Sequence, residues 1–469
     1  MLSYRKLAMR VLGRPLHTGG SDSPRPASQR AAALILTAAM LTTLTAPAFA
    51  KEWYIEEGDI TVKAGDTEGT NKVSQGENPE VEDTNTVITN SDKDKASSNT
   101  VTIEAKDKDD KVEVTLKDVN IDTSSRSEAA VSVTGEGNTN IELDGDNALK
   151  SDIYSSGISS SGSLTISGGE NDSLTAQGGS GADGIYSSGS LTISGGTVTA
   201  NGGSGGGGDG GDGIWSSGGV TISGGSTVTA NGGDGKDDYG GDGIRSDSGD
   251  VTISGGSTVT ANGGNGGNVS GDGIRSDSGD VTISGGTVKA AGGDSKDGYG
   301  GDGIRSGGVT ISGGTVNAAG GNGGKVGGYG ICSFARVAIS GGTVNAAGGN
   351  GKNSNGGSDG IISNDIDLSG SLELTAKAGR PNGKAISWAG HELDLDTIKD
   401  KLGPGAKVTT TDADGKVNQV SVPRPVEPEE PVIPGESSSS SDGGSAAPSA
   451  PASPLPGLTV TDKDGQRIS

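Results

Sequence analysis

Hydrophobic and small polar residues alternate along most of this chain, within a phrase that recurs every 27 to 30 residues. The phrase reads D-G-I-x-S, then V-T-I-S-G-G, then T-V-x-A-x-G-G, and closes with a loop of Gly, Asp and Asn. Its first isoleucine occurs at Ile185, Ile214, Ile244, Ile274, Ile304, Ile331 and Ile361. Alternation predicts short β-strands, and a fixed period of this length predicts a solenoid of stacked copies.

Two further hydrophobic columns follow the first. The second comprises Ile166, Ile193, Ile222, Ile253, Ile283, Ile311 and Ile339; the third comprises Leu174, Val198, Val228, Val259, Val288, Val316, Val344 and Leu374. Each repeat is therefore expected to hold three strands, too short to form a core alone, that pair with their equivalents in the next coil. The pattern predicts an all-β, right-handed parallel β-helix whose three-strand coils are about 30 residues long.

The repeat continues upstream in a weaker form. Val131 lies 27 residues before Ile158, and the second column is expected to continue through Leu116 and Leu143. We expect ten to twelve coils, from about Ile60 to about Leu395, with a length of roughly 50 Å at ~4.8 Å for each stacked strand.

Open strand edges at the two ends of a solenoid need caps. Trp53, Tyr54 and Ile55 are candidates for the N-terminal cap. The segment from Trp388 to Leu402 departs from the repeat, and its phrase D-T-I-K-D-K-L is typical of a short capping helix or of a last irregular coil. We assign residues 51–421 to the β-helix with its caps.

The segments outside the repeats suggest an exported protein. Residues 1–50 combine six basic residues, an apolar run and the sequence Ala48-Phe49-Ala50, which is typical of a secretory signal peptide cleaved after Ala50. Residues 422–457 are rich in Pro and Ser and predict a disordered linker before a short tail, 458–469. We expect a secreted, extracellular monomer, with cell-wall association as an option and no membrane insertion after signal cleavage.

Charge and cysteine content exclude several classes of partner and site. Residues 1–50 carry six of the basic residues and one Asp, so the chain from residue 51 onward has a net charge of −29, against −24 for the whole sequence. Such a surface does not bind nucleic acid by general electrostatics, although it attracts divalent cations. Cys332 is the only cysteine, so no internal disulfide forms. His391 is the one histidine after residue 50, which excludes a multi-histidine zinc site.

A column of aspartates precedes the first isoleucine of each repeat by two residues. Its members are Asp183, Asp212, Asp242, Asp272 and Asp302, and Asp359 follows after an interruption by Tyr329. Stacked carboxylates repel, so they need compensation. One hypothesis is that each Asp caps its own turn by accepting backbone N–H bonds. The other is that the aspartates are Ca²⁺ ligands, an option also for the loops Gly232–Tyr239 and Gly292–Tyr299, which are close to a calcium-binding nonapeptide.

A stripe of aromatic and arginine residues follows the same isoleucine. It consists of Tyr186, Trp215, Arg245, Arg275 and Arg305, and the next positions are Cys332 and Ile362. These side chains are expected to point outward along one face of the solenoid, where aromatic rings stack on sugars and Arg pairs with carboxylates. The stripe is therefore a candidate carbohydrate-binding track. The alternative is that the arginines pair only with neighbouring acids, at Asp247, Asp250, Asp277 and Asp280.

The repeats resemble a group of secreted β-helix proteins of Gram-positive anaerobes that are called carbohydrate-binding domain-containing proteins. The phrases N-I-E-L-D-G-D-N-A-L-K (140–150), S-L-T-I-S-G-G (163–169) and G-G-T-V-T-A (195–200) carry the resemblance, which covers about Thr86 to Gly379. It implies a fold similar to pectate lyases, bound calcium, and affinity for plant polysaccharides such as cellulose and acidic pectin, without established lyase activity.

Three functions remain open on the sequence. The first is a non-catalytic polysaccharide-binding β-helix associated with Ca²⁺. The second is a structural stalk or adhesin of the cell surface, which the evenness of the repeats favours. The third is a calcium-dependent polysaccharide lyase, for which Asp242, Asp272, Arg245 and Arg275 supply the residue types, but in repeated copies rather than at one unique place.

Overall fold

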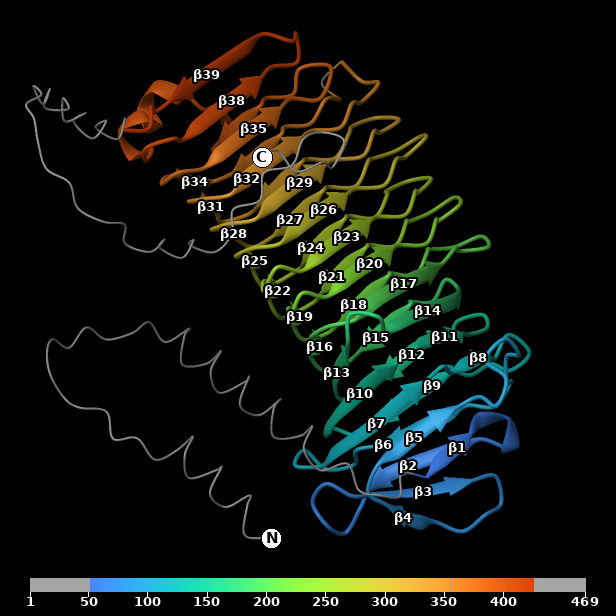
Figure 1. Ribbon diagram of the computed structural model, residues 1–469. Coiled ribbons are helices and arrows are strands. Elements are labelled where there is room, and N and C mark those ends of the chain that lie inside the picture. The colour runs from blue at the N-terminus through green and yellow to red at the C-terminus, as the bar shows by residue number, and fades with distance from the viewer. Residues whose placement is uncertain (1–50, 355, 426–469) are drawn as a thin grey trace, which may run out of the picture. The chain divides into compact units, whose positions relative to one another are not determined.

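The computed structural model describes residues 51–354 and 356–425, which form a parallel β-helix (Figure 1). The expected signal peptide, residues 1–50, lies outside the described residues, as do most of the expected linker and the tail 458–469. The predicted all-β, three-strand coil is confirmed. Within the described ranges, no helix has the length and apolar character needed to cross a membrane.

Sheet A contains the V-T-I strands, and its 12 strands among the described residues pair in one continuous order. They are β1 (Glu52–Tyr54), β5 (Thr86–Thr89), β7 (Lys111–Lys117), β10 (Asn138–Asp144), β13 (Ser163–Gly168), β16 (Leu191–Ile193), β19 (Val220–Ile222), β22 (Val251–Ile253), β25 (Val281–Ile283), β28 (Val309–Ile311), β31 (Arg336–Ile339) and β34 (Asp365–Leu368).

Sheet B contains the I-x-S strands and begins and ends with antiparallel pairs. Its strands are β4 (Val81–Asp83), β3 (Asn71–Gln75), β2 (Ile60–Ala64), β6 (Val101–Glu104), β9 (Val131–Thr134), β12 (Ile158–Ser160), β15 (Ile185–Ser187), β18 (Ile214–Ser216), β21 (Ile244–Ser246), β24 (Ile274–Ser276), β27 (Ile304–Ser306), β30 (Ile331–Ser333), β33 (Ile361–Ser363), β36 (Ile386–Trp388) and β37 (His391–Glu392).

Sheet C contains the T-V-x-A strands, which the Gly-rich loops connect to sheet B of the next coil. Its strands are β8 (Asn120–Asp122), β11 (Asp146–Lys150), β14 (Ser173–Ser180), β17 (Thr197–Gly203), β20 (Thr227–Asn231), β23 (Thr258–Asn262), β26 (Thr287–Ala291), β29 (Thr315–Ala319), β32 (Thr343–Ala347), β35 (Glu373–Lys377), β38 (Lys407–Thr411) and β39 (Val417–Ser421). Two 3₁₀ helices, η1 (Ile55–Glu57) and η2 (Leu395–Lys401), lie near the ends.

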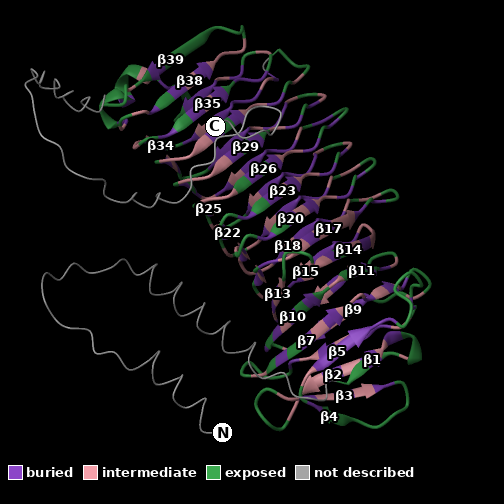
Figure 2. Ribbon diagram, in the orientation of Figure 1, coloured by how far each residue is buried: buried purple, intermediate pink, exposed green. Residues whose placement is uncertain are grey.

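The three predicted hydrophobic columns are confirmed as the core. Ile185 pairs with Ile214 in sheet B, Ile193 with Ile222 in sheet A, and Val198 with Val228 in sheet C. All of these side chains are at most 1% exposed. Figure 2 shows buried residues along the strands, while exposed residues gather at the loops and the two ends. Removal of these branched side chains from water is the main stabilising contribution to a coil that has no disulfide.

The serine of each D-G-I-x-S phrase closes a corner inside the coil. Ser216 and Ser246 are fully buried. The Ser216 Oγ donates to the Gly189 carbonyl at 2.8 Å, and the Ser246 Oγ donates to the Gly249 carbonyl at 2.6 Å. A buried hydroxyl without a partner would cost free energy, so these bonds explain why a small hydroxyl residue recurs at the turn between sheets B and A.

One predicted register is wrong by two residues. Leu116 and Leu143 pair with each other in sheet A, but Leu143 lies opposite Gly168. The residue opposite Ile166 is Ile141. Since side chains two residues apart along a strand face the same way, both choices satisfy the inward pattern, and alternation alone could not separate them.

The ends of the solenoid differ from the prediction in extent. Trp53 is buried at the N-terminal end, where its indole N–H donates to Asp83 Oδ2 at 2.7 Å, so the expected cap is confirmed in part. The antiparallel strands β2, β3 and β4 complete it. At the other end the parallel pairing continues past Leu395, since β38 pairs with β35. The helix η2 therefore belongs to the last coil, and the hairpin of β38 with β39 ends sheet C.

Candidate functional site

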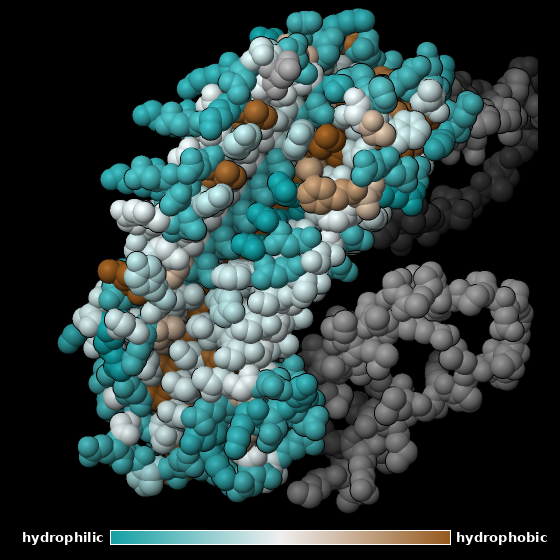
Figure 3. Space-filling view, turned by 180° about the vertical axis from the view of Figure 1, so that it is seen from behind, coloured by the Kyte–Doolittle hydropathy of each residue, from teal (hydrophilic) through white to brown (hydrophobic). Residues whose placement is uncertain are grey.

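The aromatic/arginine stripe lies on sheet B as predicted. Tyr186 pairs with Trp215, Trp215 with Arg245, Arg245 with Arg275, and Arg275 with Arg305, each in the equivalent position of the next coil. All five side chains are partly exposed or exposed. Figure 3 shows the molecule from behind, where a hydrophilic band lies beside the projecting loops and hydrophobic residues border it toward the C-terminal end.

The N-terminal end of the stripe is an ordered aromatic cluster. The Tyr186 and Trp215 ring centroids are 5.2 Å apart with an interplanar angle of 75°, an edge-to-face arrangement. The Arg245 guanidinium carbon lies 5.2 Å from the centroid of the Trp215 ring. These contacts fix the side chains in the absence of a ligand, so binding would cost little side-chain entropy.

Two of the arginines share carboxylates with their neighbours. Arg245 donates from Nε to Asp247 Oδ1 and from Nη2 to Asp277 Oδ2, both at 3.0 Å. Arg275 donates from Nε to Asp277 Oδ1 at 2.6 Å. The alternative hypothesis of acid pairing is thus correct for Asp247 and Asp277. It is wrong for Asp250, whose Oδ1 accepts the backbone N–H of the next coil at 2.9 Å.

Arg305 has a different environment. Its nearest carboxylate atom is Asp302 Oδ2, at 3.6 Å from Nη1, and its guanidinium donates no hydrogen bond within residues 51–354 and 356–425. The guanidinium carbon lies 5.2 Å from the centroid of the Phe334 ring. With 40% of its side chain exposed, Arg305 keeps donors available to a ligand.

The aspartate column is buried and connects successive coils. Each Oδ1 accepts a hydrogen bond from the backbone N–H of the next residue in the column, at 2.8 Å for Asp183 to Asp212 and at 2.5–2.6 Å for the following three pairs. Asp302 Oδ1 accepts from the Tyr329 N–H at 2.7 Å. The expectation that each Asp caps its own turn is therefore corrected, because the carboxylate accepts from the neighbouring coil. The N–H groups of its own turn, such as those of Gly243 and Ile244, already donate to backbone carbonyls of the next coil.

Burial raises the pKa of every carboxyl group in the aspartate column. Desolvation is the main cause and brings the pKa of Asp242 and Asp272 to about 7 and that of Asp183 and Asp302 to about 6. Neighbouring carboxylates raise the pKa of Asp242 and Asp272 further, while the backbone hydrogen bonds and the nearby arginines lower it. Partial protonation thus provides the compensation that stacked carboxylates require.

The calcium role of the aspartate column stays a prediction, and the geometry favours hydrogen bonding instead. No group of three or more His, Cys, Asp or Glu side chains in the described part of the chain is arranged to hold a metal ion. One oxygen of each column carboxylate already accepts a backbone bond, whereas Ca²⁺ takes six to eight oxygen ligands. These residues do not fit a resident calcium site.

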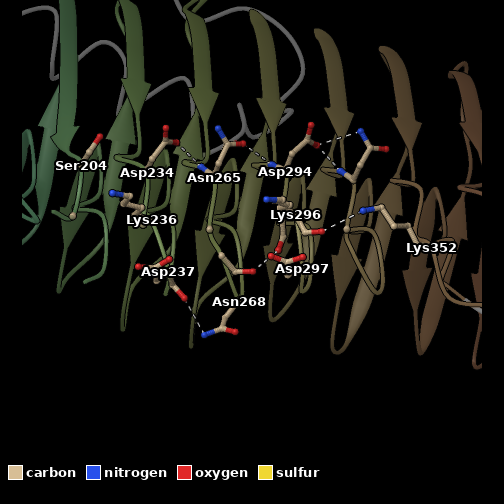
Figure 4. A pocket seen from close by; sticks show the side chains of 17 residues that line it. Ser204, Asp234, Lys236, Asp237, Asn265, Asn268, Asp294, Lys296, Asp297 and Lys352 are labelled. Atoms are coloured by element: carbon tan, nitrogen blue, oxygen red, sulfur yellow. Dashed lines mark hydrogen bonds between the residues drawn. The ribbon is translucent and has the colours of Figure 1, made fainter. Parts of the chain in front are cut away.

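The Gly-rich loops contain a second column of polar side chains that we did not predict. Asp234 Oδ1 accepts the Asn265 N–H at 2.7 Å, and Asp294 Oδ1 accepts the Asn322 N–H at 2.6 Å. They line an open groove of about 970 Å³, together with Lys236, Lys296 and Lys352 (Figure 4). The signal was present in the sequence, because Asp or Asn follows the pair Gly-Gly in each of these loops.

One stripe position and two other aromatic residues depart from the expected pattern. Cys332 occupies an outward position but is only 7% exposed, and burial raises the pKa of its thiol to about 12, so it is not a nucleophile at neutral pH. Phe334 and Trp388, which we did not predict as site residues, are 55% and 44% exposed. The available signal was that both break the repeat with a rare residue type.

A model of the Beta helix repeat family matches four segments of the chain, residues 191–214, 220–244, 281–304 and 309–331. Each segment runs from a sheet A strand to the first isoleucine of the next coil. No curated protein and no solved structure matches the chain. The comparison thus agrees with the observed coil.

Proposed function

We propose that this chain is a secreted, non-catalytic β-helix that binds a polysaccharide along the aromatic/arginine stripe. The observation that carries the proposal is the in-register stacking of Tyr186, Trp215 and three arginines on the outer surface of one sheet. Coils ~4.8 Å apart present these groups at a regular spacing, as a polymer presents its sugar units. Several weak contacts on one polymer add up through effective concentration.

The contacts along the stripe suit a polar polymer with flat faces. The edge of Tyr186 against Trp215 leaves an aromatic surface on which a sugar ring can pack. Arg245 and Arg275 are held in place by Asp277, which lies between them in the ion-pair network. This fixation preorganises their remaining N–H donors for hydroxyl or carboxylate oxygens.

Calcium belongs to the proposal only as an ion that bridges the acidic surface and an acidic glycan. A net charge of −29 after residue 50 attracts divalent cations, and a shared cation would offset repulsion between two anionic partners. Binding measured with calcium and with a chelator separates this bridging role from direct contacts.

Replacing Arg245, Arg275 and Arg305 together by alanine is expected to lower affinity for the bound polysaccharide at least tenfold, because each loses its donors and Trp215 loses its cation–π partner. Affinity electrophoresis in pectate gels and co-sedimentation with cellulose measure the effect on the full chain. The control is the triple alanine variant of Lys236, Lys296 and Lys352, which changes the charge equally on the loops. Equal retention of the arginine variant and the wild type would contradict the proposal.

A structural stalk or adhesin is the second candidate. The hydrogen bonds of the loop column favour it. The side chains of Asp234, Asn265 and Asp294 accept backbone N–H bonds from the next coil, so they stabilise the stacking of the coils. Absence of retention on either polymer by a correctly folded chain supports this candidate.

A lyase remains the alternative activity, and release of unsaturated sugar products from pectate would establish it.

A further inference from the structure

A column of Tyr and Val side chains follows the Gly-rich loops that connect sheet C to sheet B and project from one side of the coils (Figure 1). Its members are Tyr239, Val269, Tyr299 and Val326, and we call them the tyrosine/valine ridge. Each forms a parallel β-bridge with the next, so the four side chains point the same way in successive coils. Backbone hydrogen bonds of 2.9–3.0 Å hold this register, such as that from the Gly240 N–H to the Val269 carbonyl. The ridge therefore repeats at ~4.8 Å, like the strands.

The ridge is open to solvent along its length. Tyr239 and Tyr299 are 53% and 49% exposed, and Val269 and Val326 are partly exposed. Among the described residues, the one charged group over these rings is the Lys325 Nζ, at 5.8 Å from the centroid of the Tyr299 ring. Single exposed apolar residues are common on protein surfaces, whereas a contiguous column of them is typical of an interaction surface.

Large and small side chains alternate along the ridge, in the order Tyr, Val, Tyr, Val. A two-fold axis that crosses the ridge between Val269 and Tyr299 reverses this order in a second copy of the chain. Tyr239 of one copy then faces Val326 of the other, and Tyr299 of one copy faces Val269 of the other. A large side chain meets a small one at every position, which is the self-complementary shape that an isologous two-fold interface needs.

The charge of the loops changes sign along the same direction. The loops, in chain order, are 202–211, 232–240, 263–271, 292–300, 320–328 and 348–357. Their charged residues are Asp209 in the first, Asp234, Lys236, Asp237 and Asp238 in the second, none in the third, Asp294, Lys296 and Asp297 in the fourth, Lys325 in the fifth and Lys352 in the sixth. Figure 4 shows Asp234 and Asp237 toward one end of this series and Lys352 at the other. The axis that sets each Tyr on a Val also sets the first two, acidic loops of one copy opposite the last two, basic loops of the other.

One acid and one lysine beside the ridge are suited to pair between copies. Asp238 directly precedes Tyr239, and Lys325 directly precedes Val326, so the same axis sets Asp238 of each copy opposite Lys325 of the other. Within residues 51–354 and 356–425 neither side chain makes an ion pair, and the Asp238 Oδ1 accepts only a 3.3 Å hydrogen bond from the Asn268 side chain. At physiological ionic strength the Debye length is about 8 Å, so these local charges outweigh the repulsion between distant acidic surfaces.

We propose that two copies of this chain associate through the tyrosine/valine ridge as an antiparallel, two-fold symmetric dimer, in place of the monomer expected from the sequence. Shape and charge select the same axis independently of each other. Six loops at ~4.8 Å span only about 24 Å, which suits a small, reversible interface rather than an obligate one.

Sedimentation velocity of the full chain over a concentration series measures the association. The wild type is expected to shift from monomer to dimer as the concentration rises. Tyr239→Ala combined with Tyr299→Ala is expected to weaken association at least tenfold, because both large side chains leave the interface on each copy. The control is Tyr154→Ala, which removes a tyrosine that is 85% exposed on a loop of an earlier coil and is expected to have no effect.

Charge reversal tests the direction in which the two copies meet. Asp238→Lys and Lys325→Asp are each expected to weaken association about tenfold, because each sets like charges opposite each other at two places in the dimer. The double variant that carries both changes restores opposite charges and is expected to recover the wild-type association. The control for charge is Lys289→Asp, on the outer surface of β26, which is expected to have no effect.

Three outcomes contradict the dimer or its arrangement. A wild type that stays monomeric over the whole series overturns the proposal, and so does a dimer that the two tyrosine changes leave intact. Loss in both single charge variants without recovery in the double variant overturns the two-fold arrangement. Thermal unfolding midpoints close to the wild type show that the variants are folded, as expected for exposed side chains. None of these outcomes depends on polysaccharide binding, because the ridge shares no residue with the aromatic/arginine stripe.

Discussion

Replacing Gly271 by alanine is expected to destabilise the β-helix by about 3 kcal/mol, as overpacking at a site without room does. A Cβ atom at this position would lie 1.8 Å from the carbonyl oxygen and 2.4 Å from the carbonyl carbon of Gly241 in the preceding coil. Both are backbone atoms, so no side chain can rotate away. The loops must separate instead, with loss of hydrogen bonds between coils such as that from the Gly264 N–H to the Gly241 carbonyl.

The matched control is Gly285→Ala, for which the Cβ atom meets nothing within 4 Å. This change is expected to alter the unfolding free energy by less than about 0.5 kcal/mol. Urea unfolding of both variants, followed by circular dichroism, makes the comparison. Similar midpoints for the two variants would show that the Gly-rich loops are not stacked at the observed distance, since only that stacking distinguishes the two glycines.

Stability is expected to fall by a few kcal/mol as pH rises from about 4 to about 8, on account of the aspartate column. In the unfolded chain these carboxyl groups titrate near pH ~3.9, whereas burial raises the pKa of Asp242 and Asp272 to about 7 in the folded state. The folded state therefore binds more protons over this range. The stabilisation is complete below the unfolded pKa and is lost as pH rises through the folded values.

Thermal midpoints measured between pH 4 and pH 8 test this expectation. The double variant Asp242→Asn and Asp272→Asn keeps an oxygen that accepts the backbone N–H of the next coil but cannot ionise, so its profile is expected to be flatter. The control, Asp234→Asn with Asp294→Asn, makes the same charge change in the loop column, where Asn265 and Asn322 already occupy equivalent positions. A wild-type midpoint that rises steadily toward pH 8 would show that the column is not protonated in the fold.

The core was predictable because it depends on a pattern that every coil repeats. The expected columns contain Ile214, Ile222 and Val228, as the strand pairing shows. A register shift of one residue would have turned each of these hydrophobic side chains to solvent, so the alternation left one choice of inward face. The same argument fails for Leu143, where a shift of two residues preserves the inward face. The terminal hairpins could not be predicted from the repeat, because each occurs once and depends on local contacts such as that of Trp53 with Asp83.

The candidate site was predictable in its alignment but not in its contacts. The spacing of Trp215, Arg245 and Arg275 determines that they stack, because the coils are of nearly equal length. Which acid each arginine selects depends on rotamers, which the sequence does not specify. Phe334 and Trp388 lie far apart in the sequence and outside the repeated phrase, so only the folded chain shows that Asn364 joins them.

Because the terminal hairpins differ in sequence from the repeated coils, the number of coils that the gene encodes can change without a change in the hairpins. The coils that begin at Asp212, Asp242 and Asp272 have nearly the same residues, and the strands of each pair only with strands of the coil before it and the coil after it. Recombination between the corresponding DNA segments would remove or duplicate whole coils and leave the hairpins at both ends untouched. Each event would change the span of the molecule by ~4.8 Å, so alleles that encode shorter or longer forms would fold equally well and would differ mainly in reach.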